Sequence, residues 1–236
     1  MTLRQAIAFA FGTVLFPFSF CQSQEASGGG TKANLDLPFS ASGGDEEEEE
    51  APEIVVFFGQ QYEGDGVFFC CDKSGSMREG GKWGRLQSEV LKNLSGFSER
   101  CQFGIIFFDR EIVKFPQAGK PADATPAMKS AASSFLKSVQ IGRGTCTLAA
   151  MLATLTMAQQ STAKRKVIIL LSDGEQFCQG HDNAEYAKQC LADVTQRNTQ
   201  RIQINTICIG QTGAVNEDFM RKMATLNGGQ FARIIQ

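Results

Sequence analysis

Apolar runs of strand length recur along the last three quarters of the chain. They lie at 54–58, 67–71, 103–108, 167–171 and 204–209, and a last run, QFARII, closes the chain. Near-continuous apolar runs of this length are typical of strands that are buried on both faces of a sheet.

Between these runs, apolar residues return every three or four positions, which is the spacing of one helix face. The recurring positions include Trp83, Leu86, Val90, Leu94 and Phe97, then Met128, Ala132, Phe135 and Val139, and later Tyr186, Cys190, Leu191 and Val194. Thr125 followed by Pro126 favours a helix start. Residues 147–159 are apolar nearly all round and indicate a buried helix. Asn216 and Gly228 are suited to begin and end a last one.

Strands that alternate with helices predict an α/β fold. We expect a Rossmann-like, doubly wound, mostly parallel sheet with helices on both faces. One exception is expected at FFDREIVKF, residues 107–115, where only three polar residues separate two strand-like runs. That spacing favours a tight hairpin and therefore one antiparallel edge strand.

The first residues resemble an export signal. Arg4 precedes an apolar stretch at 6–20, which is shorter than the roughly 20 residues that span a bilayer. We expect residues 1–21 to be a cleaved signal peptide, with an uncleaved N-terminal anchor as the alternative. Lipidation at Cys21 is disfavoured because the bulky Phe20 stands where lipoprotein signals carry a small residue.

Residues 22–52 are rich in Gly, Ser and acidic residues, and they include the run DEEEEE at 45–50. Such a composition cannot bury enough apolar surface to fold, so we expect a disordered linker, and a folded domain over 53–236. That domain carries 21 Lys and Arg against 17 Asp and Glu. This weak excess, without a basic stripe, argues against nucleic-acid binding.

The eight cysteines fit no zinc pattern, and His181 is the only histidine. Cys70 and Cys71 lie in an apolar run and are interpreted as small buried residues. Export would place the chain in an oxidising compartment. Cys178 and Cys190 are then a candidate disulfide by proximity alone.

Polar residues follow the strand-like runs at three places, and they form the candidate site. Asp72, Ser74 and Ser76 follow one run, Asp173 follows another, and Thr145 precedes the buried helix. Ligands of open parallel sheets bind beyond the carboxyl ends of the strands. Two carboxylates and three hydroxyls are all oxygen ligands, which suit Mg²⁺ or Mn²⁺ better than zinc.

Each of these residues also has a plain structural interpretation. Ser74 and Ser76 are suited to cap a helix, and Thr145 is suited to cap the helix that follows it. Asp173, followed by a glycine, is suited to a turn. The joint pattern, rather than any single residue, favours a metal site.

Enzyme alternatives fit the sequence less well. Asp72 as a phosphorylated nucleophile would need a second Asp two residues later, where Ser74 stands. A serine hydrolase would need His181 as its base, and the chain has no Gly-x-Ser-x-Gly elbow. A phosphate-binding loop at 75–82 is rejected because Trp83 stands where Ser or Thr is required.

Three motifs together resemble the von Willebrand factor type A domain family. They are DKSGSM (72–77), GRGTCTLAAML (142–152) and IILLSDGE (168–175), and the likeness extends over roughly 64–235. It implies a metal-ion-dependent adhesion site, with direct ligands from Ser74, Ser76 and Thr145 and water-mediated contacts from Asp72 and Asp173. The family's strand order, 3-2-1-4-5-6 with one antiparallel edge strand, agrees with the expected hairpin.

The same resemblance implies a function in binding rather than catalysis. The metal would capture an Asp or Glu carboxylate of a partner protein. The alternatives are a scaffold domain with a stabilising or vestigial metal site and, less favoured, a metal-dependent phosphatase-like enzyme. We expect an extracytoplasmic protein that is secreted, periplasmic or tethered to a membrane through its N-terminus. Partner specificity is expected in the loops 78–84, 143–146 and 175–183. The segment EIVVFFG, residues 53–59, is an addition to the family pattern whose place the sequence leaves open, and one interpretation is an extra edge strand.

Overall fold

The computed structural model describes residues 52–210 and 216–234. The predicted signal peptide, and the predicted linker up to residue 51, lie outside these ranges. Both therefore stay predictions.

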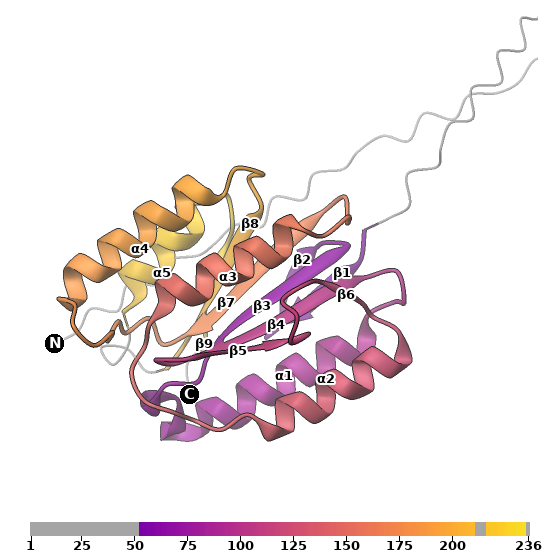
Figure 1. Cartoon of the computed structure of the whole chain (residues 1–236), viewed down its shortest axis with the longest axis horizontal. Helices are drawn as coiled ribbons and strands as arrows, with labels where there is room; N and C mark the ends of the chain where they lie inside the picture. Colours follow the sequence, from indigo (N-terminus) through magenta and orange to yellow (C-terminus); the bar gives the residue numbers. More distant parts are fainter. Residues whose placement is uncertain (1–51, 211–215, 235–236) are drawn as a thin grey trace, which may run out of the picture. The chain divides into compact units, whose positions relative to one another are not determined.

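The described residues contain one mixed sheet of seven strands (Figure 1). Five parallel strands form its body: β3 (Gly66–Asp72), β4 (Gln102–Phe108), β7 (Lys166–Ser172), β8 (Gln203–Ile209) and β9 (Phe231–Ile234). Two more, β5 (Ile112–Phe115) and β6 (Ala122–Asp123), pair antiparallel with β4. The order β5-β4-β3-β7-β8-β9 confirms the predicted fold class, with its antiparallel strand at the expected hairpin.

The helices cover both faces of this sheet, as Figure 1 shows. On one side lie α1 (Lys82–Gly96) and α2 (Pro126–Ser138), and on the other lie α3 (Thr147–Gln159), α4 (Asn183–Arg197) and α5 (Glu217–Leu226). The predicted caps are confirmed, because Thr125 accepts a hydrogen bond from the Met128 amide and Asn216 accepts one from the Phe219 amide. Within the described residues, no helix combines the length and apolar character that crossing a membrane requires.

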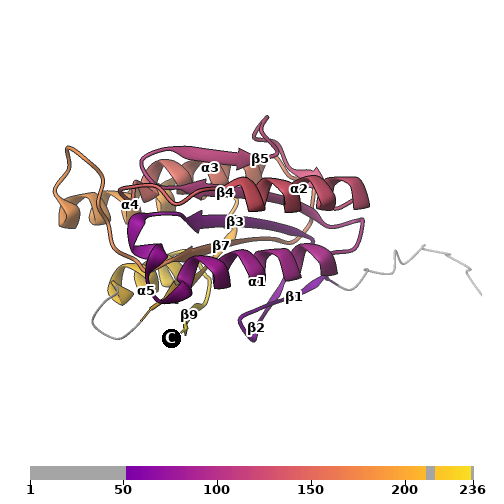
Figure 2. The same cartoon turned by 90° about the horizontal axis from the view of Figure 1, so that it is seen from below.

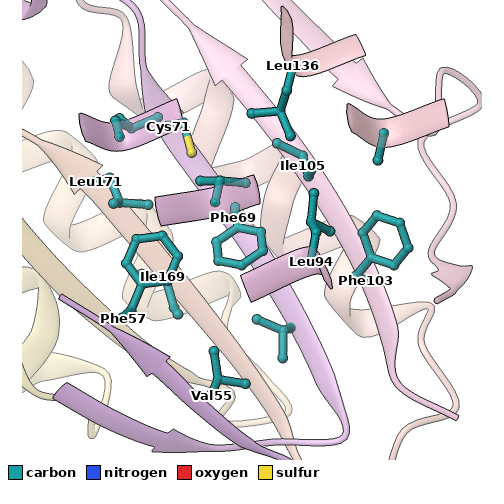
Figure 3. Close-up of a cluster of buried hydrophobic side chains, with 14 of the residues drawn as sticks. Val55, Phe57, Phe69, Cys71, Leu94, Phe103, Ile105, Leu136, Ile169 and Leu171 are labelled. Carbon is teal, nitrogen blue, oxygen red and sulfur yellow. The ribbon is translucent and has the colours of Figure 1, made fainter. Parts of the chain in front are cut away.

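The central strand β3 is buried along its whole length because side chains alternate between two cores. Phe69 and Cys71 point to the core under α1 and α2, which Figure 3 shows. Phe68 and Cys70 point to the core under α3, α4 and α5. This double burial explains the continuous apolar run in the sequence and fixes where Asp72 emerges.

Residues 54–57 correct one expectation. They form β1 (Ile54–Phe57), which pairs only with β2 (Gln60–Glu63) in a separate hairpin, not at an edge of the main sheet. The turn between them places Phe58 and Gly59 at positive φ, 47° and 80°. Figure 2 shows the hairpin alongside α1, and the Phe57 ring lies 5.4 Å from that of Phe69. The hairpin thus adds Val55 and Phe57 to the core under α1.

Helix α3 packs closely on β4 because Gly104 has no side chain. A Cβ at Gly104 would overlap the Met157 sulfur. This close approach sets the position of α3, and with it the loop before α3 that carries Thr145.

Candidate metal centre

The candidate site lies where two adjacent parallel strands end. Asp72 is the last residue of β3, and Asp173 directly follows Ser172, the last residue of β7. The two strands pair in parallel, so both aspartates emerge at the same edge of the sheet. Both are almost completely buried. The predicted convergence of the two motifs is therefore present in the structure.

Both carboxylate oxygens of Asp72 are held by hydrogen bonds. The Ser74 amide donates to Oδ1 at 2.7 Å, and the Ser172 hydroxyl donates to Oδ2 at 2.7 Å. Ser172 Oγ in turn accepts from the Gly174 amide at 2.9 Å. Ser172 thus links the β3 loop to the Asp173 loop. Sequence reasoning missed it, although it stands directly before Asp173 in the motif.

The pKa of Asp72 is raised from 3.8 to about 7. Burial contributes most, because it disfavours the charged form, and the negative charge of Asp173 adds to it. The hydrogen bonds from Ser172 and Ser74 act in the opposite direction but do not cancel the rise. Two buried carboxylates therefore repel each other at this edge, and a positive ion between them would relieve that repulsion.

The hydroxyls beside Asp72 are not used as helix caps. Ser74 precedes the short 3-10 helix η1 (Gly75–Gly81) yet makes no side-chain capping bond, and its Oγ lies 3.0 Å from Ser76 Oγ. Thr145 does not cap α3 either, since the capping position belongs to Cys146. The turn interpretation of Asp173 is met in part, because its Oδ1 accepts from the Glu175 amide at 3.3 Å.

The Thr145 loop is tied to its neighbours through the backbone. The Gly142 amide donates to the Lys73 carbonyl at 2.8 Å, and the Thr145 amide donates to the Phe177 carbonyl at 2.6 Å. Thr145 is thereby held between the β3 loop and the β7 loop. Among the described residues, its hydroxyl forms no hydrogen bond with the other four candidate ligands. Thr145 is buried at the same edge of the sheet as Asp72 and Asp173.

A disulfide joins Cys146 to Cys178, so the expected pairing of Cys178 with Cys190 is wrong. Cys190 is buried on α4 and its thiol is free, because its helix position faces the core rather than the loop. Cys70 and Cys71 are buried free thiols, as predicted. The observed bond joins the loop that carries Thr145 to the loop after Asp173.

Two buried ion pairs flank the site, and no local sequence pattern predicts either of them. Lys73 Nζ lies 2.7 Å from Asp109 Oδ1, and Lys82 Nζ lies 3.2 Å from Asp173 Oδ2. Asp109 also accepts hydrogen bonds from the amides of Glu111 and Arg143. The first pair joins the β3 loop to the hairpin loop, and the Arg143 amide ties Asp109 to the Thr145 loop. The second pair reaches a candidate ligand directly.

The donor atoms of this set are all oxygen. Within the described residues, no three His, Cys, Asp or Glu side chains gather as a metal group. The exposed His181 ring packs on Tyr186, with centroids 5.0 Å apart, and forms no hydrogen bond with a described serine. Two carboxylates with three hydroxyls remain as the donor set, which suits a hard cation.

Comparison with protein families bears on this arrangement. The model of the von Willebrand factor type A domain matches residues 66–235. The chain belongs to the von Willebrand factor type A (VWA) domain family. The match begins at β3 and runs to the end of β9, so the β1–β2 hairpin precedes the family's own elements.

The VWA domain is similar to several known proteins. Human inter-alpha-trypsin inhibitor heavy chain H4 is 30% identical over 71% of this chain, which spans 18% of that protein's length. A solved von Willebrand factor type A structure from Catenulispora acidiphila has a TM-score of 0.61 at 18% identity, covering 80% of this chain and 47% of the other. The vWF domain of the type V pili tip protein Mfa5 from Porphyromonas gingivalis has a TM-score of 0.55 at 14% identity, covering 78% and 90%. At these identities the solved structures show a shared fold.

Proposed function

We propose that this VWA domain binds a partner protein through a divalent cation, Mg²⁺ or Mn²⁺, at the edge formed by β3 and β7. Ser74, Ser76 and Thr145 would be the direct ligands. Asp72 and Asp173 would act through water molecules and as hydrogen-bond acceptors. An Asp or Glu carboxylate of the partner would complete the coordination. VWA domains commonly serve as interaction or adhesion modules, which agrees with this role.

The buried pair Asp72 and Asp173 carries the proposal. Burying two like charges costs free energy unless a cation or a proton compensates them. The pKa of Asp72 is raised to about 7 by burial and by Asp173, which agrees with incomplete compensation of the two charges. The hydroxyls of Ser74 and Ser76 lie next to Asp72 and make no capping bonds. These residues therefore fit a hard, oxygen-preferring cation.

The neutral hydroxyl ligands explain why such a metal would bind a carboxylate of a partner protein. Hydroxyl oxygens add no negative charge, and the carboxylate oxygens of Asp72 are already engaged by Ser74 and Ser172. A cation held in this way keeps much of its positive charge. An incoming carboxylate is then a favourable ligand, and no bond of the partner needs to break.

The N-terminal pattern and the disulfide support an extracytoplasmic location, secreted, periplasmic or tethered through the N-terminus. A disulfide between Cys146 and Cys178 persists most readily in an oxidising compartment. The similarity to a domain of a pili tip protein agrees with this placement.

Calorimetric titration of the full chain with Mg²⁺ and Mn²⁺ tests the metal site. We expect one binding site in the unmodified chain and none in Asp72→Ala. Asp218→Ala, which removes an exposed carboxylate on α5, is the matched control and should bind as the unmodified chain does. No binding at millimolar metal in the unmodified chain, or equal binding by Asp72→Ala, would refute the site.

A second experiment separates binding from a purely structural metal. A peptide display library with one fixed Asp or Glu would be selected on the protein in MgCl₂ and eluted with a chelator. Chelator-eluted peptides whose binding requires the fixed acid support carboxylate capture. Peptides that stay bound in the chelator, together with a melting temperature that depends on metal, would instead favour the scaffold interpretation.

A further inference from the structure

Lys82 is a buried cation in contact with one of the candidate ligands. It is the first residue of α1 and is only 6% exposed, and its ammonium lies 3.2 Å from Asp173 Oδ2. The two residues are 91 positions apart in the sequence. A lysine is almost never buried without a partner, and Asp173 is the partner that the structure gives it.

The ion pair between Lys73 and Asp109, at the same edge of the sheet, offers a comparison for the pair between Lys82 and Asp173. Its distance is 2.7 Å, and Asp109 is also fixed by two backbone amides from different loops. Asp173 Oδ2, by contrast, has Lys82 as its hydrogen-bond donor, and only Oδ1 meets a backbone amide. The oxygen that faces Lys82 is thus held by a cation and not by the fixed framework.

The charges at the site set up a competition. When both are ionised, Asp72 and Asp173 carry two negative charges, and Lys82 cancels one of them in a region with little solvent. A divalent cation entering beside Asp173 meets a second positive charge on the same carboxylate. Interactions between charges at such distances are strong when both are buried.

We propose that Lys82 is a built-in competitor of the metal, which lowers the affinity of the site for divalent cations by holding Asp173. This inference rests on the proposed metal site and names the residue that tunes it. The site then holds its metal weakly by itself. A partner carboxylate restores the negative charge that Lys82 cancels, so metal and partner are bound together more readily than either alone.

The test compares Mn²⁺ binding by the full chain and by Lys82→Met, using the electron paramagnetic resonance signal of free Mn²⁺. Methionine is unbranched and one atom shorter, so it fills most of the buried volume without the charge. We expect Lys82→Met to bind Mn²⁺ about tenfold more tightly or better. Lys82→Arg keeps the charge and should stay within about threefold of the unmodified chain.

Two further variants locate the effect. Asp72→Ala combined with Lys82→Met should lose the gain, which places it at this site and not elsewhere. Lys73→Met removes a buried ammonium paired with Asp109 and should change the affinity less than Lys82→Met. Thermal unfolding without metal shows whether each variant is folded at the temperature of the titration.

The outcomes separate this inference from the proposed function. If the unmodified chain binds Mn²⁺ and Lys82→Met binds equally or more weakly, the competitor role is wrong and the metal site stands. If only Lys82→Met binds measurably at millimolar Mn²⁺, the competitor role is supported, whereas metal binding by the unmodified chain, as proposed above, is refuted. If neither binds at millimolar Mn²⁺, both are overturned.

Discussion

Cys146 and Cys178 are joined by a disulfide although they are 32 positions apart in the chain. Cys146 directly follows the candidate ligand Thr145, and Cys178 directly follows Phe177, whose carbonyl accepts the Thr145 amide. A covalent bond and a hydrogen bond thus hold the same two loops together at the candidate site.

Removing this disulfide should loosen the site as well as the fold. In Cys146→Ser combined with Cys178→Ser, we expect the free energy of unfolding to fall by about 2–4 kcal/mol, because a closed loop no longer restricts the unfolded chain. Affinity for Mn²⁺ should fall too, since Thr145 is held less firmly. Urea denaturation and metal titration measure the two effects. Cys190→Ser should keep its disulfide by mass analysis, and losing it there would restore the pairing of Cys178 with Cys190.

The raised pKa of Asp72 predicts how the metal-free protein responds to pH. Its folded-state pKa is about 7, against 3.8 for an ordinary Asp, so the folded state holds this proton more tightly than the unfolded state. Without metal, the contribution of Asp72 to stability therefore falls as the pH rises from about 4 to about 7. The Asp72→Asn variant lacks this loss and should be more stable than the unmodified chain at pH 8, by about 1–3 kcal/mol.

Urea denaturation between pH 4 and pH 8 in a chelator measures this difference. Added Mg²⁺ should stabilise the unmodified chain and leave Asp72→Asn unchanged. If the free energies of unfolding of the two proteins change in parallel with pH, ionisation of the buried Asp72 does not destabilise the fold, and the prediction is wrong.

Asp109 should show the opposite dependence on pH. Burial alone would raise its pKa, but the Lys73 ammonium and the amides of Glu111 and Arg143 outweigh burial and lower it. The contribution of Asp109 to stability is therefore present above the ordinary Asp value and is lost as the pH falls through the lowered one. Asp109→Asn should cost about 3 kcal/mol at pH 7, because it leaves the Lys73 ammonium without its charge partner. The cost should shrink towards pH 2.5 in urea denaturation, and a constant cost would contradict this account.

The contacts of Asp109 with Lys73 and with the Arg143 amide require a glycine at position 142. A Cβ at this position would overlap Asp109 Oδ2 and lie 3.3 Å from Lys73 Nζ. Gly142→Ala should therefore displace the Thr145 loop, lower the free energy of unfolding by about 2 kcal/mol and weaken metal binding. Gly84→Ala is the control, since a Cβ at Gly84 on α1 meets nothing within 4 Å. It should stabilise the helix by about 0.5–1 kcal/mol. Equal behaviour of the two variants would rule out the steric argument.

The main sheet was predictable because its strands are buried on both faces. Every residue of β3 is buried, so the apolar run in the sequence marks the whole strand. The β1–β2 hairpin gave a weaker signal, since β2 buries only Tyr62. Its turn places Phe58 at positive φ, which sequence patterns associate with Gly or Asn rather than with Phe. The second strand was missed for this reason.

The candidate ligands were predictable, but the residues that support them were not. Asp72 and Asp173 stand at strand ends, a position that a linear pattern reveals. The roles of Ser172 and Lys82 depend on contacts with residues about a hundred positions away. The partner of Cys178 likewise depends on which loops meet at the sheet edge. No local pattern carries that information, because it arises only when the strands are placed side by side.

The five free cysteines of the described residues are all buried, and burial raises the pKa of Cys70 to about 12. In the folded protein these thiols are out of reach of oxidants, whereas in the newly made chain each of them can react with Cys146 or Cys178. Closing the sheet over the other thiols before oxidation would therefore favour the bond between Cys146 and Cys178. In an oxidising compartment, the yield of correctly paired protein would then depend on how fast the chain folds relative to the oxidation of its thiols.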